Sequence, residues 1–374
     1  MTVFDVGLEV LRQRQSMKWT RYAPDVLPLW VAEMDCLLSP AARAAVEEAV
    51  RIGDFGYHGR LVLEPAWIRY AQDAWGLQLD DRQVAACGNV MAGMTALVEH
   101  LTPPDAVIAT TSPIYAPFRP AATVGGRGLA TVGMTAQGRL DLPGLARLFD
   151  QRRPAAFLLC NPHNPCGSIA TAEELQTVAD LARQYQVLVI VDEIHSLVHD
   201  PAVEFVPYLS LPGGADGLVV TSASKAFGLA GVAAGLTVAG DNRVEQMWSL
   251  PYEVRASASH LGLLAQTAAL DLDRAWLAQL NREIVEHKEL LAECLAQVGL
   301  AYQPSPATYL AWVDCSSLGL ADPAAHFLER GRVAFNGGAE YDPAHGQWIR
   351  INLATSPEIV RQAIRRLAVA LEGH

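Results

Sequence analysis

The sequence predicts an α/β protein with a mostly parallel β-sheet that helices cover on both faces. Short apolar runs without polar alternation recur along the chain, which is typical of strands buried on both sides. Amphipathic helical segments separate these runs. Polar segments follow them directly, and ligands of such sheets bind beyond the carboxyl ends of the strands. The expected strands are 84–87, 106–109, 155–160, 187–191 and 217–220.

The composition indicates a protein that acts on small molecules. A chain of 374 residues is expected to hold about two to three domains. Its 28 basic and 40 acidic residues give a net charge of −12, which argues against a nucleic-acid or anionic-membrane surface. No apolar run approaches the roughly 18 residues of a membrane span, and the amino end lacks the basic and apolar regions of a signal peptide. We therefore expect a cytoplasmic protein without membrane contact.

The cysteines predict neither a disulfide framework nor a metal site. Six cysteines in a chain of this length are too sparse for such a framework. Cys160 and Cys166 also lack the CxxC spacing of a zinc or redox site. We expect reduced thiols, most of them in the core, and no bound metal.

The first expected strand leads into a possible phosphate site. A turn over 88–93 follows strand 84–87, and a helix over 94–101 comes next. A strand-to-helix turn directs backbone N–H groups at whatever lies in front of it, which suits a phosphate. The amides of Val90, Met91 and Ala92 are the predicted ligands, although many α/β proteins have such turns.

The next three strands also end in polar segments. Strand 106–109 leads to Tyr115, strand 155–160 leads to Asn164, and strand 187–191 leads to Asp192 and His195. Between the last two strands, residues 171–174 form a capping box, which predicts a helix to about residue 184.

The last expected strand delivers a single lysine. Strand 217–220 is followed by Ser222, Ser224 and Lys225. Lysine is mostly exposed in proteins, so a solvated surface residue is the simple interpretation. A desolvated amine is instead a nucleophile. The polar segments at the other strand ends favour this second interpretation, because all of them would meet at one edge of the sheet.

The remainder of the chain predicts a linking helix and a smaller unit. Helical periodicity runs over 260–298 with an interruption near 271–274, which suits a helix between two domains. Short strands over 308–313 and 348–353 follow, and a helix over 356–371 ends the pattern.

These side chains fit an aldehyde cofactor that carries a phosphate and a pyridine ring. Lys225 would form the Schiff base, and Asp192 would keep a proton on the pyridine nitrogen, which makes the ring an electron sink. Asn164 would donate to the phenolic oxygen and Tyr115 would stack on the ring. Ser222 and Ser224 would bind the phosphate together with the amides over 90–92.

Three motifs carry a family resemblance. They are Asn-Pro-x-Asn-Pro-x-Gly over 161–167, Asp-Glu-x-His over 192–195 and Ser-x-Ser-Lys-x-Phe over 222–227. In this order and spacing they resemble the fold-type I pyridoxal phosphate (PLP) enzymes of the class I/II aminotransferase family. Segments 27–35, 55–57, 192–195 and 305–312 are similar to the MalY/PatB group of cystathionine β-lyases, which are carbon–sulfur (C–S) lyases.

The resemblance implies an architecture. It implies a large PLP-binding domain over 47–280, with a mostly parallel seven-stranded sheet between helices. It also implies a smaller α/β domain formed by both chain ends, 1–46 and 281–374. A homodimer is expected, with Tyr57 reaching the phosphate of the neighbouring subunit's cofactor.

The resemblance also implies roles for site residues. Lys225 would shuttle protons as well as hold PLP, and Tyr115 and Asp192 would share in catalysis. Arg350 would clamp the substrate α-carboxylate, which suits a bidentate guanidinium. Ala32 and Tyr309 are further substrate-binding candidates.

His195 and two departures from the family pattern leave questions open. His195 stands where many aminotransferases keep a tyrosine near the phenolic oxygen, but a buried histidine without a chemical role explains it equally well. Ala233 replaces the aminotransferase arginine that grips the phosphate, which favours the lyase group. Gly228 stands where that group often has asparagine, with no evident consequence.

The other assignments also have structural alternatives. Asp192 could cap a strand end, and Asn164 could stabilise a turn. Arg350 could form a structural ion pair. Tyr115 and Tyr57 could be core or interface aromatics.

The resemblance implies a PLP-dependent β-elimination of cystathionine or S-substituted cysteines to pyruvate, ammonia and a thiol. An aminotransferase is the alternative, because the same carbanion can be reprotonated on the cofactor. A regulatory, partner-binding protein that retains PLP is a more distant alternative.

Overall fold

The central sheet of the computed structural model has seven strands, and the model describes residues 2–59 and 62–372. The strand order is β2-β8-β7-β6-β5-β3-β4. β8 is antiparallel to its neighbours β2 and β7, and the other pairs are parallel, which confirms the predicted sheet. The strands are β2 (Val84–Cys87), β3 (Val107–Ser112), β4 (Gly128–Gly133), β5 (Ala156–Cys160), β6 (Leu188–Asp192), β7 (Gly217–Thr221) and β8 (Gly235–Ala239).

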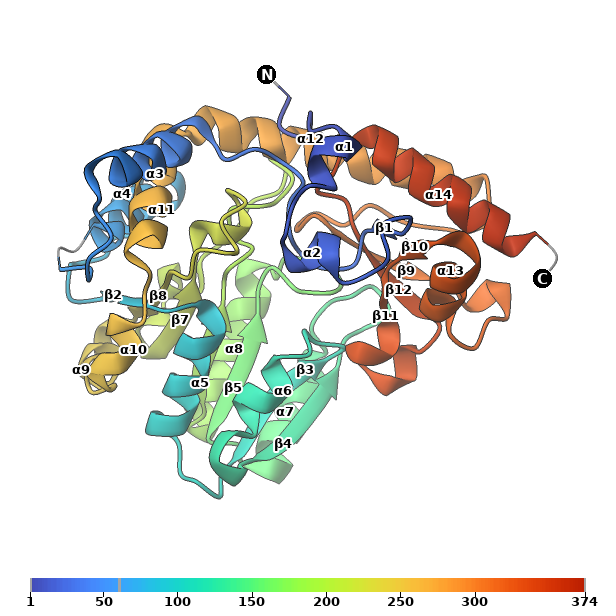
Figure 1. Ribbon diagram of the computed structural model, residues 1–374. Coiled ribbons are helices and arrows are strands. Elements are labelled where there is room, and N and C mark those ends of the chain that lie inside the picture. Colours follow the sequence, from blue (N-terminus) through green and yellow to red (C-terminus); the bar gives the residue numbers. More distant parts are fainter. Residues whose placement is uncertain (1, 60–61, 373–374) are drawn as a thin grey trace.

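Helices cover both faces of this sheet (Figure 1). Successive residues of one strand enter different apolar clusters: Leu158 packs on one face and Phe157 on the other. This double burial explains why the strands are continuous apolar runs. Helices α5 (Val90–Leu101), α6 (Phe118–Ala122) and α9 (Val244–Trp248) contribute to one cluster, and α3 (Pro40–Ile52), α4 (Leu63–Trp75), α7 (Leu142–Arg152), α8 (Ala172–Tyr185) and α11 (His260–Leu272) to the other. The short helix α10 (Tyr252–Ala256) lies against β2 and α5.

The helix boundaries confirm one capping prediction and correct another. The capping box of α8 is present, with Thr171 and Glu174 each bonded to the backbone of the other. The turn predicted over 88–93 is wrong from Val90 onward, because α5 already begins there. Asn89 is its N-cap, and its side chain accepts a hydrogen bond from the Ala92 N–H at 2.9 Å.

Both chain ends build a second, smaller core (Figure 1). Val6, Leu11 and Leu27 share an apolar cluster with Leu291 and Leu367. β11 (Asn336–Gly337), β12 (Trp348–Asn352) and β9 (Leu310–Asp314) form an antiparallel sheet, and β1 (Leu27–Pro28) pairs with β10 (Val333–Ala334). The helices here are α1 (Leu8–Leu11), α2 (Met17–Thr20), α13 (Pro323–Gly331) and α14 (Pro357–Leu371).

A long helix joins the two cores. The predicted interruption lies at Asp273, between α11 and α12 (Arg274–Ala296). The first half of α12 buries Leu277 and Leu280 in the larger core, and its second half buries Leu291 and Leu295 in the smaller one. The predicted domain boundaries after residues 46 and 280 stay predictions, and their outer ends, residues 1 and 374, lie outside the described residues.

No helix in the described part of the chain is both long and apolar enough to cross a membrane.

Candidate active site

A cavity of about 200 Å³ lies where the central strands end. It lies between the carboxyl ends of the parallel strands and the smaller core, as expected for an open α/β sheet. Its lining contains most of the predicted site residues: Ala32, Val90, Met91, Tyr115, Asn164, Asp192, His195, Ser224, Lys225 and Arg350.

Lys225 lies on the wall of this cavity and is not a solvated surface residue. It ends a single 3-10 turn after β7, in which Ser222 caps the turn by accepting from the Ser224 N–H. Its Nζ donates to the Ala32 carbonyl oxygen at 2.7 Å. Burial, with a further contribution from the Arg350 charge, lowers the pKa of Lys225 to about 8. A fraction of the amine is therefore neutral, and so nucleophilic, near neutral pH.

Asp192 is a buried carboxylate at the last position of β6. It is 3 % exposed, and its Oδ1 accepts a hydrogen bond from the Ile194 N–H at 2.9 Å. Burial raises the pKa of Asp192 to about 7. It forms no ion pair with any described residue. A buried carboxylate without a counter-ion is costly, so the site favours a cationic ligand atom beside it.

Arg350 is a buried guanidinium, 3 % exposed, on β12. Its Nη1 donates to Asn164 Oδ1 at 2.9 Å, and its Nη2 donates to Asn336 Oδ1 and to the Trp30 carbonyl oxygen. All these partners are neutral, and within residues 2–59 and 62–372 it has no ion pair. The structural ion pair considered as the alternative is therefore not formed. The positive charge remains available to an anionic group in the cavity.

The phosphate-binding residues predicted from the sequence fall into two groups. Val90 and Met91 line the cavity at the start of α5, where backbone N–H groups have no partner within the helix. Ala92 does not line it, and its N–H is already bonded to the Asn89 side chain. Likewise Ser224 lines the cavity, whereas Ser222 lies behind it.

Ser222 supports the loop from below. Its Oγ lies 2.9 Å from Ser224 Oγ and 2.8 Å from the Ala234 carbonyl oxygen. The Gln266 side chain is also within hydrogen-bond distance. Ser222 thus stabilises the turn that carries Ser224 and Lys225.

The aromatic candidates occupy different layers of the site. Tyr115 lines the cavity, and burial raises its pKa. His195 also lines it, and burial lowers its pKa to about 3, which keeps the ring neutral. Its Nδ1 has no hydrogen-bond partner among the described residues. Tyr309 lies behind the wall, where its hydroxyl donates to the Ala32 carbonyl oxygen at 3.2 Å. The rings of His195 and Tyr309 meet edge to face.

Tyr57 does not join the cavity of its own chain. It lies fully exposed on the loop after α3, near the exposed Phe55. Its predicted contact involves a second subunit and stays a prediction.

Five further residues line the cavity: Val31, Asn89, Cys160, Ile194 and Ala230. Asn89 was detectable, because an asparagine between a strand and a helix is a common N-cap. Val31, Ile194 and Ala230 carry no polar group that would single them out in the sequence.

Gly228 has a left-handed backbone, with φ of +69°. Glycine and, less readily, asparagine adopt this region, so both residues satisfy the same local requirement. The departure at Gly228 is therefore conformationally neutral.

The donors of the cavity match each functional group of PLP. The α5 amides and Ser224 suit its phosphate, and the uncompensated Asp192 carboxylate suits a protonated pyridine nitrogen. The amide nitrogen of Asn164 is free to donate to the phenolic oxygen, since Arg350 occupies its Oδ1. Lys225 supplies the amine for the aldehyde.

Comparisons with known proteins agree over almost the whole chain. A candidate cystathionine β-lyase of Mycobacterium leprae is 36% identical over 388 residues, covering 97% of this chain and 96% of the relative. The cystathionine β-lyase of Corynebacterium glutamicum is 29% identical, covering 97% of this chain and 99% of the relative.

A solved structure from Corynebacterium diphtheriae, described as a candidate PLP-dependent β-cystathionase, has a TM-score of 0.95 and 31% identity and covers 100% of both chains. The family model of aminotransferase class I and II matches residues 25–367. The chain therefore belongs to the class I and II aminotransferase family.

Proposed function

We propose that this protein is a PLP-dependent C–S lyase that cleaves cystathionine or S-substituted cysteines into pyruvate, ammonia and a thiol. The observation that carries the proposal is the cavity itself. It combines a lysine of lowered pKa, a buried carboxylate and a buried guanidinium, neither with a counter-ion. The near full-length relatives named cystathionine β-lyases support the same reaction.

PLP is the cofactor of this family, and when bound it supplies an electron sink for the α-carbon of an amino acid. The protein's residues supply the rest. Arg350 binds the substrate α-carboxylate, and its bond to Asn164 fixes the orientation of that amide. Lys225 holds the cofactor, and Asp192 keeps a positive charge on the pyridine nitrogen. Tyr115 lies in the same cavity and is placed to stack on the ring.

Lys225 is also the proposed base. Its neutral amine removes the α-proton, and the bond from the β-carbon to sulfur then breaks with both electrons leaving on sulfur. The thiolate takes a proton to become the thiol. Water completes the conversion of the remaining three-carbon fragment into pyruvate and ammonia. A pKa near 8 suits a group that both takes and returns a proton near neutral pH.

An assay of the purified protein with PLP tests the proposal. We expect equal amounts of pyruvate and thiol from cystathionine and from simple cysteine S-conjugates, and neither product from Lys225→Ala. Absence of both products across a panel of thioethers, from a protein that binds PLP, would overturn it.

An aminotransferase is the second candidate, because the matching family model describes aminotransferases. Addition of a keto acid separates the two activities. Transamination would convert the bound cofactor to its amine form and consume the keto acid, whereas a lyase would release thiol without it.

The assembly and location are part of the same proposal. We expect a homodimer in which Tyr57 reaches the phosphate of the neighbouring subunit's cofactor. The exposure of Tyr57 and Phe55 on one loop supports this arrangement. The composition supports a cytoplasmic location, and the two apolar cores support a large domain over 47–280 with a small domain from both chain ends.

A further inference from the structure

The backbone over residues 30–34 has no regular structure, yet every one of its carbonyl groups accepts from a side chain. Such a segment has no helix or sheet partners, so side chains must satisfy its polar groups. Ala32 stands in the middle, and its carbonyl oxygen accepts from Lys225. The donors in chain order are Arg350 to Trp30, Asn352 to Val31, Lys225 and Tyr309 to Ala32, Asn352 and Lys18 to Glu33, and Arg14 to Met34.

Asn352 is fully buried and holds both neighbours of Ala32. Its amide nitrogen donates to the carbonyl oxygens of Val31 and Glu33, each at 2.7 Å. Its Oδ1 accepts from the Ala354 N–H at 2.8 Å, which sets the direction of the amide. The two clamped carbonyls lie on either side of the one that accepts from Lys225. Asn352 therefore determines where the Ala32 oxygen points.

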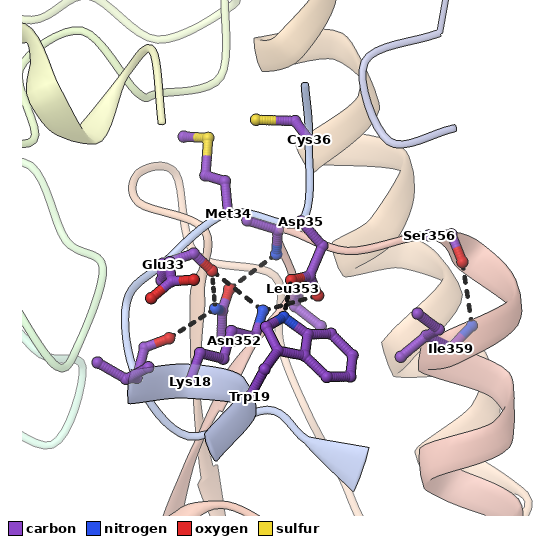
Figure 2. Close-up of polar contacts among 12 residues, drawn as sticks. Lys18, Trp19, Glu33, Met34, Asp35, Cys36, Asn352, Leu353, Ser356 and Ile359 are labelled. Atoms are coloured by element: carbon purple, nitrogen blue, oxygen red, sulfur yellow. Dashed lines mark hydrogen bonds and ion pairs between the residues drawn. The ribbon is translucent and has the colours of Figure 1, made fainter. Parts of the chain in front are cut away.

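A buried ion pair anchors the far end of the same segment. Figure 2 shows the Lys18 ammonium between the Asp35 carboxylate and the Glu33 carbonyl, close to the Asn352 amide. Lys18 Nζ lies 2.7 Å from Asp35 Oδ2, and Trp19 Nε1 donates to Asp35 Oδ1 at 3.0 Å. Since both charges are buried, the pair has one well-defined geometry.

We propose that Asn352 is a positioning residue for Lys225, acting through the Ala32 carbonyl, with the Lys18–Asp35 pair locking the segment in place. The inference rests on the proposed role of Lys225 as the reactive amine. An ammonium that keeps a fixed carbonyl acceptor retains its proton more firmly than one facing an unanchored chain. The clamp on 30–34 thereby sets the acidity of the lysine.

Charged and titratable groups face Lys225 from several elements. Asp192 comes from β6, His195 from the loop after it, Arg350 from β12, and Glu33 from the clamped segment itself. Arg350 lowers the pKa of Lys225, whereas Glu33 and Asp192 raise it. Release of the segment would remove the Ala32 acceptor and also move the Glu33 carboxylate. Both changes lower the pKa of the lysine.

The chain contains only three lysines, Lys18, Lys225 and Lys288, which makes the test direct. Protein labelled with ¹³C at the lysine Cε gives three resonances whose pH titration is followed by NMR after removal of PLP. The Lys225 resonance is the one missing from Lys225→Ala. Lys288 is an internal reference, because it donates to the Ser305 and Ala307 carbonyls and does not touch the segment.

Asn352→Ala is compared with Gln83→Ala. Gln83 is a matched control: its buried amide nitrogen also donates to two oxygens, those of Ala239 and Asp241, and its carbonyl accepts one N–H, far from the cavity lining. We expect Asn352→Ala to lower the Lys225 midpoint by about one pKa unit, the size of a hydrogen bond to a charged group. Gln83→Ala should leave the midpoint unchanged at a similar loss of thermal stability.

An unchanged Lys225 midpoint in Asn352→Ala, or an equal shift in Gln83→Ala, would overturn the proposal. Asn352→Ser keeps one donor and decides the question if the alanine variant does not fold. It should give a smaller shift in the same direction, and no shift would count against the proposal. The titration needs no substrate, so its result is independent of whether the lyase assay succeeds.

Discussion

Arg350 Nη1 donates to Asn164 Oδ1 at 2.9 Å, which links β12 of the smaller core to the loop after β5 of the larger one. One residue is the proposed clamp for the substrate carboxylate and the other the proposed partner of the cofactor's phenolic oxygen. Their bond places both functions in one rigid unit. Substrate binding at Arg350 is thus felt directly at the cofactor contact.

Arg350→Lys should reduce kcat/KM for cystathionine by roughly 100-fold or more. Lysine keeps the charge but cannot reach Asn164, Asn336 and the Trp30 carbonyl while also binding a carboxylate in two places. The absorbance of bound PLP should remain, because the change lies on the substrate side. Arg43→Lys, in an exposed ion pair on α3, is the control and should behave like the unaltered protein. Unchanged kcat/KM in Arg350→Lys would remove the residue from the substrate site.

Borohydride treatment of the PLP-loaded protein should attach one cofactor per chain, at Lys225. The other two lysines are committed, Lys18 to Asp35 and Lys288 to two carbonyls. Peptide mass spectrometry locates the adduct. Modification of Lys18 or Lys288 in folded protein, or of no lysine, would contradict the assignment.

Asp192→Asn should stabilise the cofactor-free protein at pH 8 while weakening PLP binding. The pKa of Asp192 is raised from its ordinary value to about 7, so the folded state holds its proton at a pH where the unfolded state has lost it. This contribution falls as the pH rises from about 4 to about 7, and above that the ionised carboxylate destabilises the fold. The gain in unfolding free energy at pH 8 should be roughly 1–4 kcal/mol.

Urea unfolding at pH 5 and pH 8 measures the effect of Asp192→Asn. The gain should be much smaller at pH 5. Asp81→Asn, at an exposed position, should change stability equally little at both values. A gain for Asp192→Asn that does not depend on pH would show that ionisation of Asp192 is not its source.

Gly228→Ala should destabilise the protein by about 1–2 kcal/mol, because alanine is strained in the left-handed region. Its Cβ would also lie 3.0 Å from Cys36 Sγ. Gly228→Asn should cost less, since asparagine tolerates this backbone. Gly231→Ala is the control, with open space around the added carbon. Chemical denaturation ranks the three variants, and equal losses for Gly228→Ala and Gly231→Ala would refute the conformational explanation.

Local sequence signals predicted much of the fold. The capping box at Thr171 and the interruption at Asp273 were readable because each depends on a few neighbouring residues. The start of α5 was predicted late, because the small and apolar residues after Asn89 resemble a turn. Strand β8 was not identified, and its antiparallel direction depends on the sheet rather than on its own residues.

The site was predictable where a residue follows a strand, and less so where tertiary packing decides. Lys225, Asp192 and Asn164 stand directly after apolar strands, and the structure brings all three to one cavity. The clamp by Asn352 was not predictable, because it joins residues more than 300 positions apart in the chain. Nothing local in the sequence marks such a contact.

The most direct test of the account is product analysis with cystathionine as substrate and PLP as cofactor. The proposed function predicts that pyruvate and free thiol appear in equal amounts without any keto acid, and that Lys225→Ala yields neither. Conversion that requires a keto acid and releases no thiol would contradict it and identify an aminotransferase instead.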